Sequence, residues 1–240
     1  MTLFISSCQA PNSKTLVIGH RGARGHVAEN TLASINKAIE LGVDGVEIDI
    51  FRCATGELVV FHDKTLDVLT NGTGYIEQMP LDSIKQFLVL GKEPIPTLNE
   101  VMDLIDGTIQ LNIELKGTQT AVLTSELIEH YFETSNWEAK NVFISSFDWN
   151  ELDQFYKVNQ KVAIAVLTED DPIDAIPVAK RLAAFAINPD FKSLTEANVE
   201  KIHKAGFKVY PWTVNELEDI ERMIAIGVDA LITDFPERIR

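Results

Sequence analysis

The sequence lacks any apolar run that approaches the length of a membrane span, so hydropathy predicts no transmembrane helix. It has only two cysteines, Cys8 and Cys53, which are too few for a disulfide framework and lack metal-binding spacing. Basic residues are also scarce, because 21 Lys and Arg stand against 36 Asp and Glu, a formal net charge of −15 at pH 7. This charge argues against nucleic acid or an anionic membrane as a general partner. It still allows an anionic substrate, since a bound cation and a few basic groups can reverse the field inside one pocket.

The first 14 residues precede the first predicted strand and form an N-terminal tail. Residues 3–8, which end in Cys8, are similar to the end of a bacterial lipoprotein signal, in which small residues precede an acylated cysteine. This similarity predicts a trimmed signal with a lipid anchor at Cys8 and a place in the cell envelope. No Lys or Arg precedes Cys8 and the apolar region is short, so an accidental similarity in a cytoplasmic protein is the alternative.

Strand and helix patterns alternate over residues 15–240. Eight short apolar runs predict strands at 16–19, 43–50, 109–115, 142–145, 162–167, 184–187, 208–212 and 230–233. Between the first two runs, Asn30 or Thr31 can cap a helix that reaches Leu41 and is closed by Gly42. Buried strands that alternate with helices indicate a parallel sheet. Eight such units in 240 residues predict an α/β protein with a TIM (β/α)₈ barrel.

One connection is too long for a simple barrel. Residues from about 51 to 107 contain a hairpin-like turn at 54–57, a short strand at 58–61 and then several Gly and Pro residues. The segment leaves the carboxyl end of the second strand, the face where barrel enzymes place their active sites. We therefore expect a small inserted cap region over the mouth of the barrel.

Two carboxylates, Glu47 and Asp49, interrupt the apolar second strand. Side chains at i and i+2 of a strand point to the same face, so the two charges lie side by side in an apolar setting. A divalent cation is the commonest way to stabilise such a pair; two carboxylates that simply face water on an edge strand are the alternative. Glu114 stands near the end of the next barrel strand and adds a third oxygen ligand. Such ligands suit Ca²⁺ or Mg²⁺.

Further polar residues stand at the ends of strands. His20 and His62 each follow an apolar run and are candidates for a catalytic acid–base pair. Arg21 and Lys116 could hold the oxygens of an anion, although Lys116 could also merely bridge a carboxylate. Trp212 could line the site or only pack at the rim. Together with the carboxylates, these residues indicate metal-assisted chemistry on an anion.

Other polar residues receive a structural interpretation. Asp63 is interpreted as a turn residue that fixes His62, and Asp234 as a structural residue at the end of the last strand. No role is expected for the three remaining histidines, His26, His130 and His203.

Short motifs in a fixed order over almost the whole chain resemble those of the glycerophosphodiester phosphodiesterases. They are the segments 19–22, 29–31, 47–49, 62–63, 95–98, 114–116, 212–215 and 227–234. The resemblance implies a TIM barrel with a small insertion after the second strand. It also implies hydrolysis of a small-molecule glycerophosphodiester to glycerol 3-phosphate and an alcohol, with one divalent cation. By this resemblance the acid–base pair is His20 and His62, the metal ligands are Glu47, Asp49 and Glu114, and Arg21 and Lys116 hold phosphate.

Two alternatives stay open at this point. A related phospholipase C or D type of lipid phosphodiesterase would use much the same mouth but should show an apolar or basic interfacial surface. A Schiff-base lyase would use Lys116 as nucleophile and would leave the carboxylates and both histidines unexplained. We further expect the inserted region, which carries His62, to select the alcohol half of the substrate.

Overall fold

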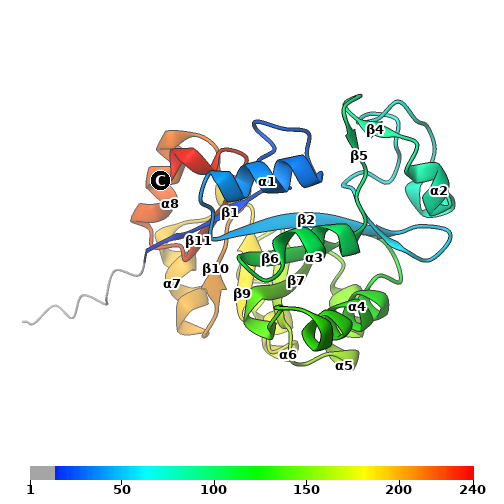
Figure 1. Cartoon of the computed structure of the whole chain (residues 1–240). Coiled ribbons are helices and arrows are strands. Elements are labelled where there is room, and N and C mark those ends of the chain that lie inside the picture. Colours follow the sequence, from blue (N-terminus) through cyan, green and yellow to red (C-terminus); the bar gives the residue numbers. More distant parts are fainter. Residues whose placement is uncertain (1–13) are drawn as a thin grey trace, which may run out of the picture.

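A computed structural model describes residues 14–240, and the predicted anchor residue Cys8 lies outside this range. Eight parallel strands form a nearly closed barrel, as predicted (Figure 1). They are β1 (Leu16–Gly19), β2 (Gly45–Arg52), β6 (Gln110–Leu115), β7 (Val142–Ser146), β8 (Ala163–Thr168), β9 (Ala186–Pro189), β10 (Lys208–Val209) and β11 (Ala230–Thr233). Their spatial order is β10-β9-β8-β7-β6-β2-β1-β11. Among the described residues, no helix is long and apolar enough to cross a bilayer.

The barrel closes between β10 and β11, where the predicted strand at 208–212 is shorter than expected. Only residues 208–209 form a regular ladder with β9, because Pro189 of β9 has no N–H with which to continue it. Tyr210 N and Trp212 N still donate to Ile187 O and Pro189 O, both at 3.1 Å. Two backbone hydrogen bonds join the edges instead: Asp229 N donates to Val209 O at 3.0 Å, and Ile232 N donates to Pro211 O at 3.0 Å. The ring of strands is thus completed by single contacts rather than by a regular pairing.

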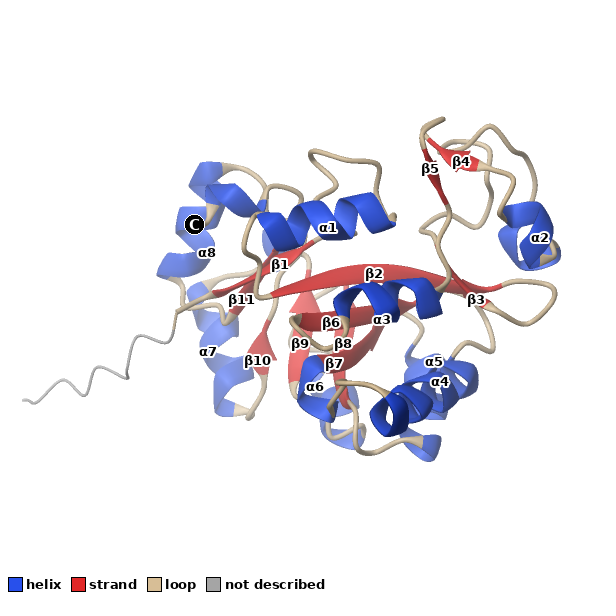
Figure 2. Cartoon of the chain, viewed as in Figure 1, coloured by secondary structure: helices blue, strands red, loops and turns tan. Residues whose placement is uncertain are grey.

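Seven helices pack around the outside of the barrel (Figure 2). They are α1 (Leu32–Glu40), α3 (Leu98–Ile105), α4 (Ala121–Thr134), α5 (Trp149–Val158), α6 (Ile176–Arg181), α7 (Glu196–Lys204) and α8 (Leu217–Ala225). Short 3₁₀ helices lie at Ile76–Gln78, Ala139–Asn141, Phe191–Ser193 and Pro236–Arg238. Thr31 is the N-cap of α1, since its Oγ1 accepts from Ser34 N at 3.1 Å, and Gly42 follows the helix with φ +76°.

Side chains alternate in direction along each barrel strand, so successive apolar residues belong to two different clusters. On β7, Val142 and Ile144 belong to the large cluster under the helices, whereas Phe143 belongs to a second cluster inside the barrel. That inner cluster consists of Ile18, Phe143, Ala165, Ala186, Tyr210, Ala230 and Ile232. Two residues further along three of these strands, the inward positions become polar: His20, Ser145 and Asn188. The barrel is therefore filled with apolar groups below and is polar at the carboxyl ends of its strands.

The inserted segment forms a small unit beyond the carboxyl end of β2 (Figure 1). It contains β3 (Leu58–Val60), α2 (Leu81–Ile84), β4 (Leu88–Val89) and β5 (Glu93–Pro94), and β3 pairs antiparallel with β2 as the predicted hairpin requires. Phe61, Leu66, Ile84 and Val89 help to form its own apolar cluster. In contrast, α3 buries its apolar face in the barrel core. The range predicted for the insertion, about 51–107, therefore includes one helix that packs as part of the barrel.

Candidate active site

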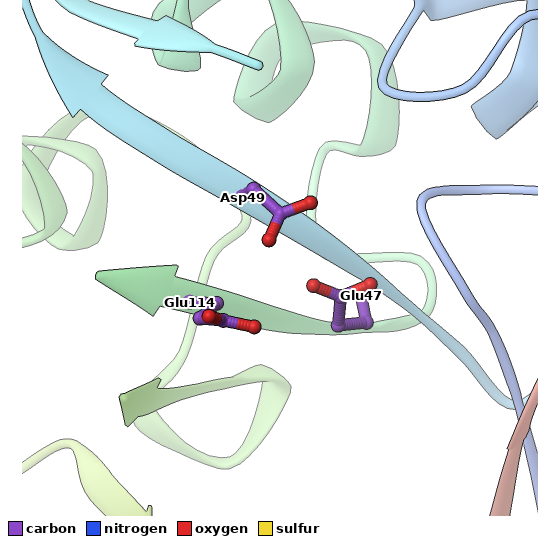
Figure 3. Close-up of side chains that lie close together, drawn as sticks. All are labelled: Glu47, Asp49 and Glu114. Carbon is purple, nitrogen blue, oxygen red and sulfur yellow. The ribbon is translucent and has the colours of Figure 1, made fainter. Parts of the chain in front are cut away.

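Three buried carboxylates from the neighbouring strands β2 and β6 converge on one face of the sheet (Figure 3). Asp49 and Glu114 are register partners, and Glu47 lies two residues before Asp49 on the same face. The relative exposures of Glu47, Asp49 and Glu114 are 4%, 1% and 8%. Their candidate ligand oxygens all lie within 4.8 Å of one another. The structure thus brings together the three residues that were predicted to hold a cation.

The electrostatics of this cluster fit a cation. Burial, with the neighbouring carboxylates Asp49 and Glu114, raises the pKa of Glu47 well above its usual value. Burial and then Asp49 raise the pKa of Glu114 to about 7. Glu47 Oε1 is buried and has no hydrogen-bond partner within residues 14–240. Mutual repulsion and an unpartnered buried oxygen are both relieved by a hard cation, so the residues present could hold a divalent metal ion.

Two basic side chains border the carboxylates. Arg21 Nε lies 3.3 Å from Asp49 Oδ2, and its Nη1 donates to Glu29 Oε1 at 2.5 Å. Lys116 Nζ lies 3.1 Å from Glu114 Oε1 and 3.7 Å from Asp49 Oδ1. Burial acts to raise the pKa of Asp49, but Arg21 and Lys116 outweigh it and hold that pKa below its usual value. Asp49 is therefore charged beside two permanent cations.

Asn30, which belongs to the family motif at 29–31, fixes the orientation of Asp49, a role that its position in the sequence does not predict. Its side-chain Nδ2 donates to Asp49 Oδ2 at 2.8 Å, and its Oδ1 accepts from Asp49 N at 3.2 Å. Asn30 is fully buried and has φ 57°, a left-handed conformation that asparagine tolerates better than most residues. Its polar side chain was interpreted only as a helix cap, whereas Thr31 caps the helix.

Each predicted catalytic histidine has a carboxylate partner at Nδ1. His20 Nδ1 lies 2.6 Å from Asp234 Oδ1, and Asn215 Nδ2 donates to the other oxygen of Asp234 at 2.8 Å. His62 Nδ1 lies 2.7 Å from Asp63 Oδ1. The structural role expected for Asp234 is therefore incomplete, because this residue also contacts His20. Its distance of 214 positions along the chain concealed that contact.

The protonation state of His20 follows from its contacts. Burial acts to raise the pKa of Asp234, but the hydrogen bond with His20 outweighs it, so Asp234 is ionised and accepts from Nδ1–H. Burial lowers the pKa of His20 below its usual value, and the Asp234 hydrogen bond offsets only part of that effect. At the other ring nitrogen, Nε2 accepts from Arg21 Nε at 3.2 Å. His20 is thus a neutral imidazole whose Nε2 carries a lone pair.

These side chains line one cavity of about 280 Å³. Every predicted site residue except Asp49 lines it: His20, Arg21, Glu47, His62, Glu114, Lys116 and Trp212. Asp49 lies just behind, in ion pairs with Arg21 and Lys116. The lining also includes residues that sequence analysis missed, namely Asn112, Phe147, Leu167, Glu169 and Ile232.

The remaining histidines and the insertion contribute little to this cavity. His26 and His203 form ion pairs with Glu237 and Asp229, and neither lines the cavity; nor does His130. Of the inserted segment, only His62 is among the lining residues. The expected selection of an alcohol by the insertion therefore finds no support in the lining of the site.

The fold and the site define an α/β barrel with acid–base, cation-binding and anion-binding groups at the carboxyl ends of its strands. The chain belongs to the glycerophosphoryl diester phosphodiesterase family, whose sequence model matches residues 20–238. A glycerophosphodiester phosphodiesterase from Caldanaerobacter subterraneus is 39% identical over 94% of this chain and 96% of its own length. The predicted family and class of enzyme, a phosphoric diester hydrolase, are confirmed.

Solved structures agree with this family. A phosphodiesterase from Oleispira antarctica, in complex with the product sn-glycerol-3-phosphate, superposes with a TM-score of 0.84 at 30% identity. The match covers 93% of this chain and 94% of that chain. The glycerophosphodiester phosphodiesterase from Thermotoga maritima has a TM-score of 0.77 at 27% identity, over 93% of this chain and 96% of its own. The predicted fold class is confirmed.

Proposed function

We propose that this enzyme hydrolyses glycerophosphodiesters to glycerol 3-phosphate and an alcohol in the cavity described above. The observation that carries the proposal is the meeting of three carboxylates, two basic side chains and two histidines around a single cavity of about 280 Å³. The names of the Caldanaerobacter and Thermotoga relatives and the product bound by the Oleispira enzyme support this substrate class.

In this proposal Glu47, Asp49 and Glu114 hold one divalent cation, Ca²⁺ or Mg²⁺. When bound, the cation neutralises negative charge on the phosphodiester and so favours attack at phosphorus. Arg21 and Lys116 line the same cavity and hold phosphate oxygens, the guanidinium through parallel donors and the ammonium as a point charge. Trp212 completes the substrate-binding set.

The two histidines move the protons. The free 2-hydroxyl of the glycerol half is held near phosphorus by covalent bonds, so its attack avoids much of the entropic cost of recruiting water. His20 Nε2 takes the proton of that hydroxyl, because it is unprotonated at rest. The new P–O bond forms as the P–O bond to the alcohol breaks, and His62 gives its proton to the departing oxygen. Asp63, 2.7 Å from His62 Nδ1, stabilises the protonated ring that this role requires.

A second step opens the cyclic phosphodiester with water. His62, now neutral, takes a proton from the water as its oxygen bonds to phosphorus. The bond between phosphorus and the glycerol 2-oxygen breaks, and His20 returns its proton to that oxygen. Glycerol 3-phosphate leaves, and both histidines regain their starting protonation states.

Purified protein assayed against several glycerophosphodiesters, with detection of glycerol 3-phosphate, tests the proposal. Turnover should require Ca²⁺ or Mg²⁺ and should be abolished by chelator. His62→Ala should reduce kcat by at least about two orders of magnitude. His203→Ala is the matched control, because that histidine is also paired with an aspartate but lies away from the cavity. Full turnover in excess chelator, or no glycerol 3-phosphate from any substrate, would refute the proposal.

The contacts of Lys116 weigh against a Schiff-base lyase. A lysine nucleophile must be neutral, yet Lys116 Nζ is paired with both Glu114 and Asp49. Burial acts to lower the pKa of Lys116, but the charges of Glu114 and Asp49 outweigh it and raise that pKa above its usual value. The ammonium form is therefore the stable one, which suits a phosphate-binding role.

A further inference from the structure

One side of the cavity takes no part in the proton transfers or in cation binding. It is formed by Phe147, Leu167, Glu169 and Trp212, which follow or end strands β7, β8 and β10. Around the barrel, β8 and β1 are separated by three strands in either direction. These are β7, β6 and β2 one way, and β9, β10 and β11 the other. The end of β8 therefore lies across the mouth from the end of β1. Glu169 thus stands across the mouth from His20 and Arg21.

Phe147 and Trp212 form an aromatic corner in this side of the cavity. Their ring centroids are 5.3 Å apart at an interplanar angle of 88°. Trp212 is held in place by its Nε1, which donates to Asn188 O at 2.9 Å. The Phe147 side chain is 38% exposed even though it is a large apolar group. Aromatic faces that remain accessible in a polar mouth are suited to apolar groups and to cations.

The charge on this side of the cavity is negative. Glu169 is exposed at its rim, and none of the ion pairs formed by residues 14–240 includes it. Across the cavity, the positive charge of Arg21 is next to Glu29 and Asp49. Lys116, at the end of β6, is next to Glu114. The cavity therefore presents the Arg21 guanidinium on one side and, across the mouth from it, Glu169, which has no ion-pair partner among residues 14–240. Phe147 and Trp212 lie in the same lining as Glu169.

We propose that Phe147, Trp212 and Glu169 form a subsite for the alcohol half of the substrate, and that this subsite selects alcohols that carry an ammonium group. The inference rests on the proposed function, because a phosphate held beside Arg21 directs its second ester group across the mouth toward Glu169. There the ammonium group lies against the aromatic faces, with Glu169 as its counter-charge. Glu169 is then a specificity-determining residue of this enzyme.

The test compares two substrates of nearly equal shape. One is glycerophosphocholine, and the other is its analogue in which 3,3-dimethylbutanol replaces choline, so that a neutral carbon replaces the ammonium nitrogen. The measured quantity is the ratio of kcat/KM for the choline ester to kcat/KM for the neutral ester. Wild-type enzyme should give a ratio of about ten, the scale of one cation–π contact plus one exposed charge pair.

Variants assign that preference to residues. Glu169→Gln should lower the ratio to about three or less, since only the aromatic contact remains. Phe147→Leu, which keeps an apolar side chain but removes the ring, should also lower it. Glu133→Gln is the matched control, because it removes the same charge from an exposed site on α4 and should leave the ratio unchanged. Added salt should lower the wild-type ratio more than that of Glu169→Gln.

The outcomes separate this inference from the proposed function. A wild-type enzyme that cleaves both esters at equal kcat/KM has no ammonium subsite, although it remains a glycerophosphodiester phosphodiesterase. A ratio that is the same in Glu169→Gln and wild type removes Glu169 from selectivity and overturns the proposed subsite. Failure of wild-type enzyme to release glycerol 3-phosphate from either ester refutes the function itself.

Discussion

His20 and Asp234 are 214 positions apart in the chain, yet His20 Nδ1 lies 2.6 Å from Asp234 Oδ1. The contact forms because β1 and β11 are parallel neighbours, with Gly19 in register with Thr233. Each residue is the next one after its strand. The ends of two paired strands thus place a carboxylate against the buried ring nitrogen of the proposed base.

Asp234→Asn should therefore reduce kcat/KM by about two orders of magnitude or more, because an amide cannot hold His20 in the Nδ1–H tautomer or stabilise its protonated ring. The pH profile should change as well, since the ionised partner no longer supports protonation of His20. Glu237→Gln, which removes the partner of the surface residue His26, should leave both quantities unchanged. An Asp234→Asn enzyme with wild-type kcat/KM and pH profile would show that this carboxylate only supports the fold.

The sequence could predict the barrel and the meeting of the candidate site residues around one cavity because these signals are local. An apolar strand interrupted at Glu47 and Asp49 indicates both a buried strand and a shared face. The partners of those residues are not local. Asn30 and Asp234 stand in loops at the ends of elements, where their residue types are common. Strand register places Asp234 beside His20, and the loop before α1 places Asn30 against Asp49. The short ladder of β10 likewise depends on Pro189 of the neighbouring strand β9, which the composition of the run at 208–212 does not reveal.

Asn30→Ala should lower the free energy of unfolding by about 1–3 kcal/mol, because the buried Asp49 carboxylate and its backbone N–H both lose a partner. Alanine also tolerates the left-handed φ of 57° less well than asparagine does. Denaturant unfolding measures the first effect, and calorimetric titration with Ca²⁺ should show weaker binding, since Asp49 is no longer held in place. Asn30→Gly relieves the backbone conformation alone, so it should recover part of the stability but none of the cation affinity. Wild-type affinity in both variants would contradict a positioning role for Asn30.

When chelator has removed any metal ion, the pH dependence of the melting temperature should reveal the ionisation of the carboxylate cluster. Glu114 has its pKa raised to about 7 by burial and by Asp49, so in the folded state it holds a proton that the unfolded chain has already released. The contribution of Glu114 to the free energy of unfolding is therefore fully present below the pKa that this residue has in the unfolded chain. It is lost as the pH rises toward 7. The glutamine side chain of the Glu114→Gln variant does not ionise. The Tm of this variant minus the Tm of wild type should therefore increase as pH is raised from acid to neutral.

Added cation should reverse this trend in the wild-type protein. Because a cation binds the ionised carboxylates of the folded state only, Ca²⁺ or Mg²⁺ should raise the wild-type Tm more at neutral pH than at acid pH. The same additions should have a smaller effect on Glu114→Gln, which lacks one charged ligand. Differential scanning calorimetry of both proteins at the two pH values, with and without each cation, measures these effects. A Tm that does not respond to either cation would exclude a metal site at these residues.

A substrate analogue without the free 2-hydroxyl of glycerol should bind but turn over at least about two orders of magnitude more slowly than the parent, because the internal nucleophile is missing. Its inhibition constant against the parent substrate measures binding, and release of the alcohol measures turnover. His20→Ala should reduce turnover of the parent strongly and should change the residual rate of the analogue much less, since the analogue has no hydroxyl for His20 to deprotonate. Cleavage of the analogue at the parent rate would instead favour direct attack by water on phosphorus. In that case His20 would have to be reassigned as the group that activates the water.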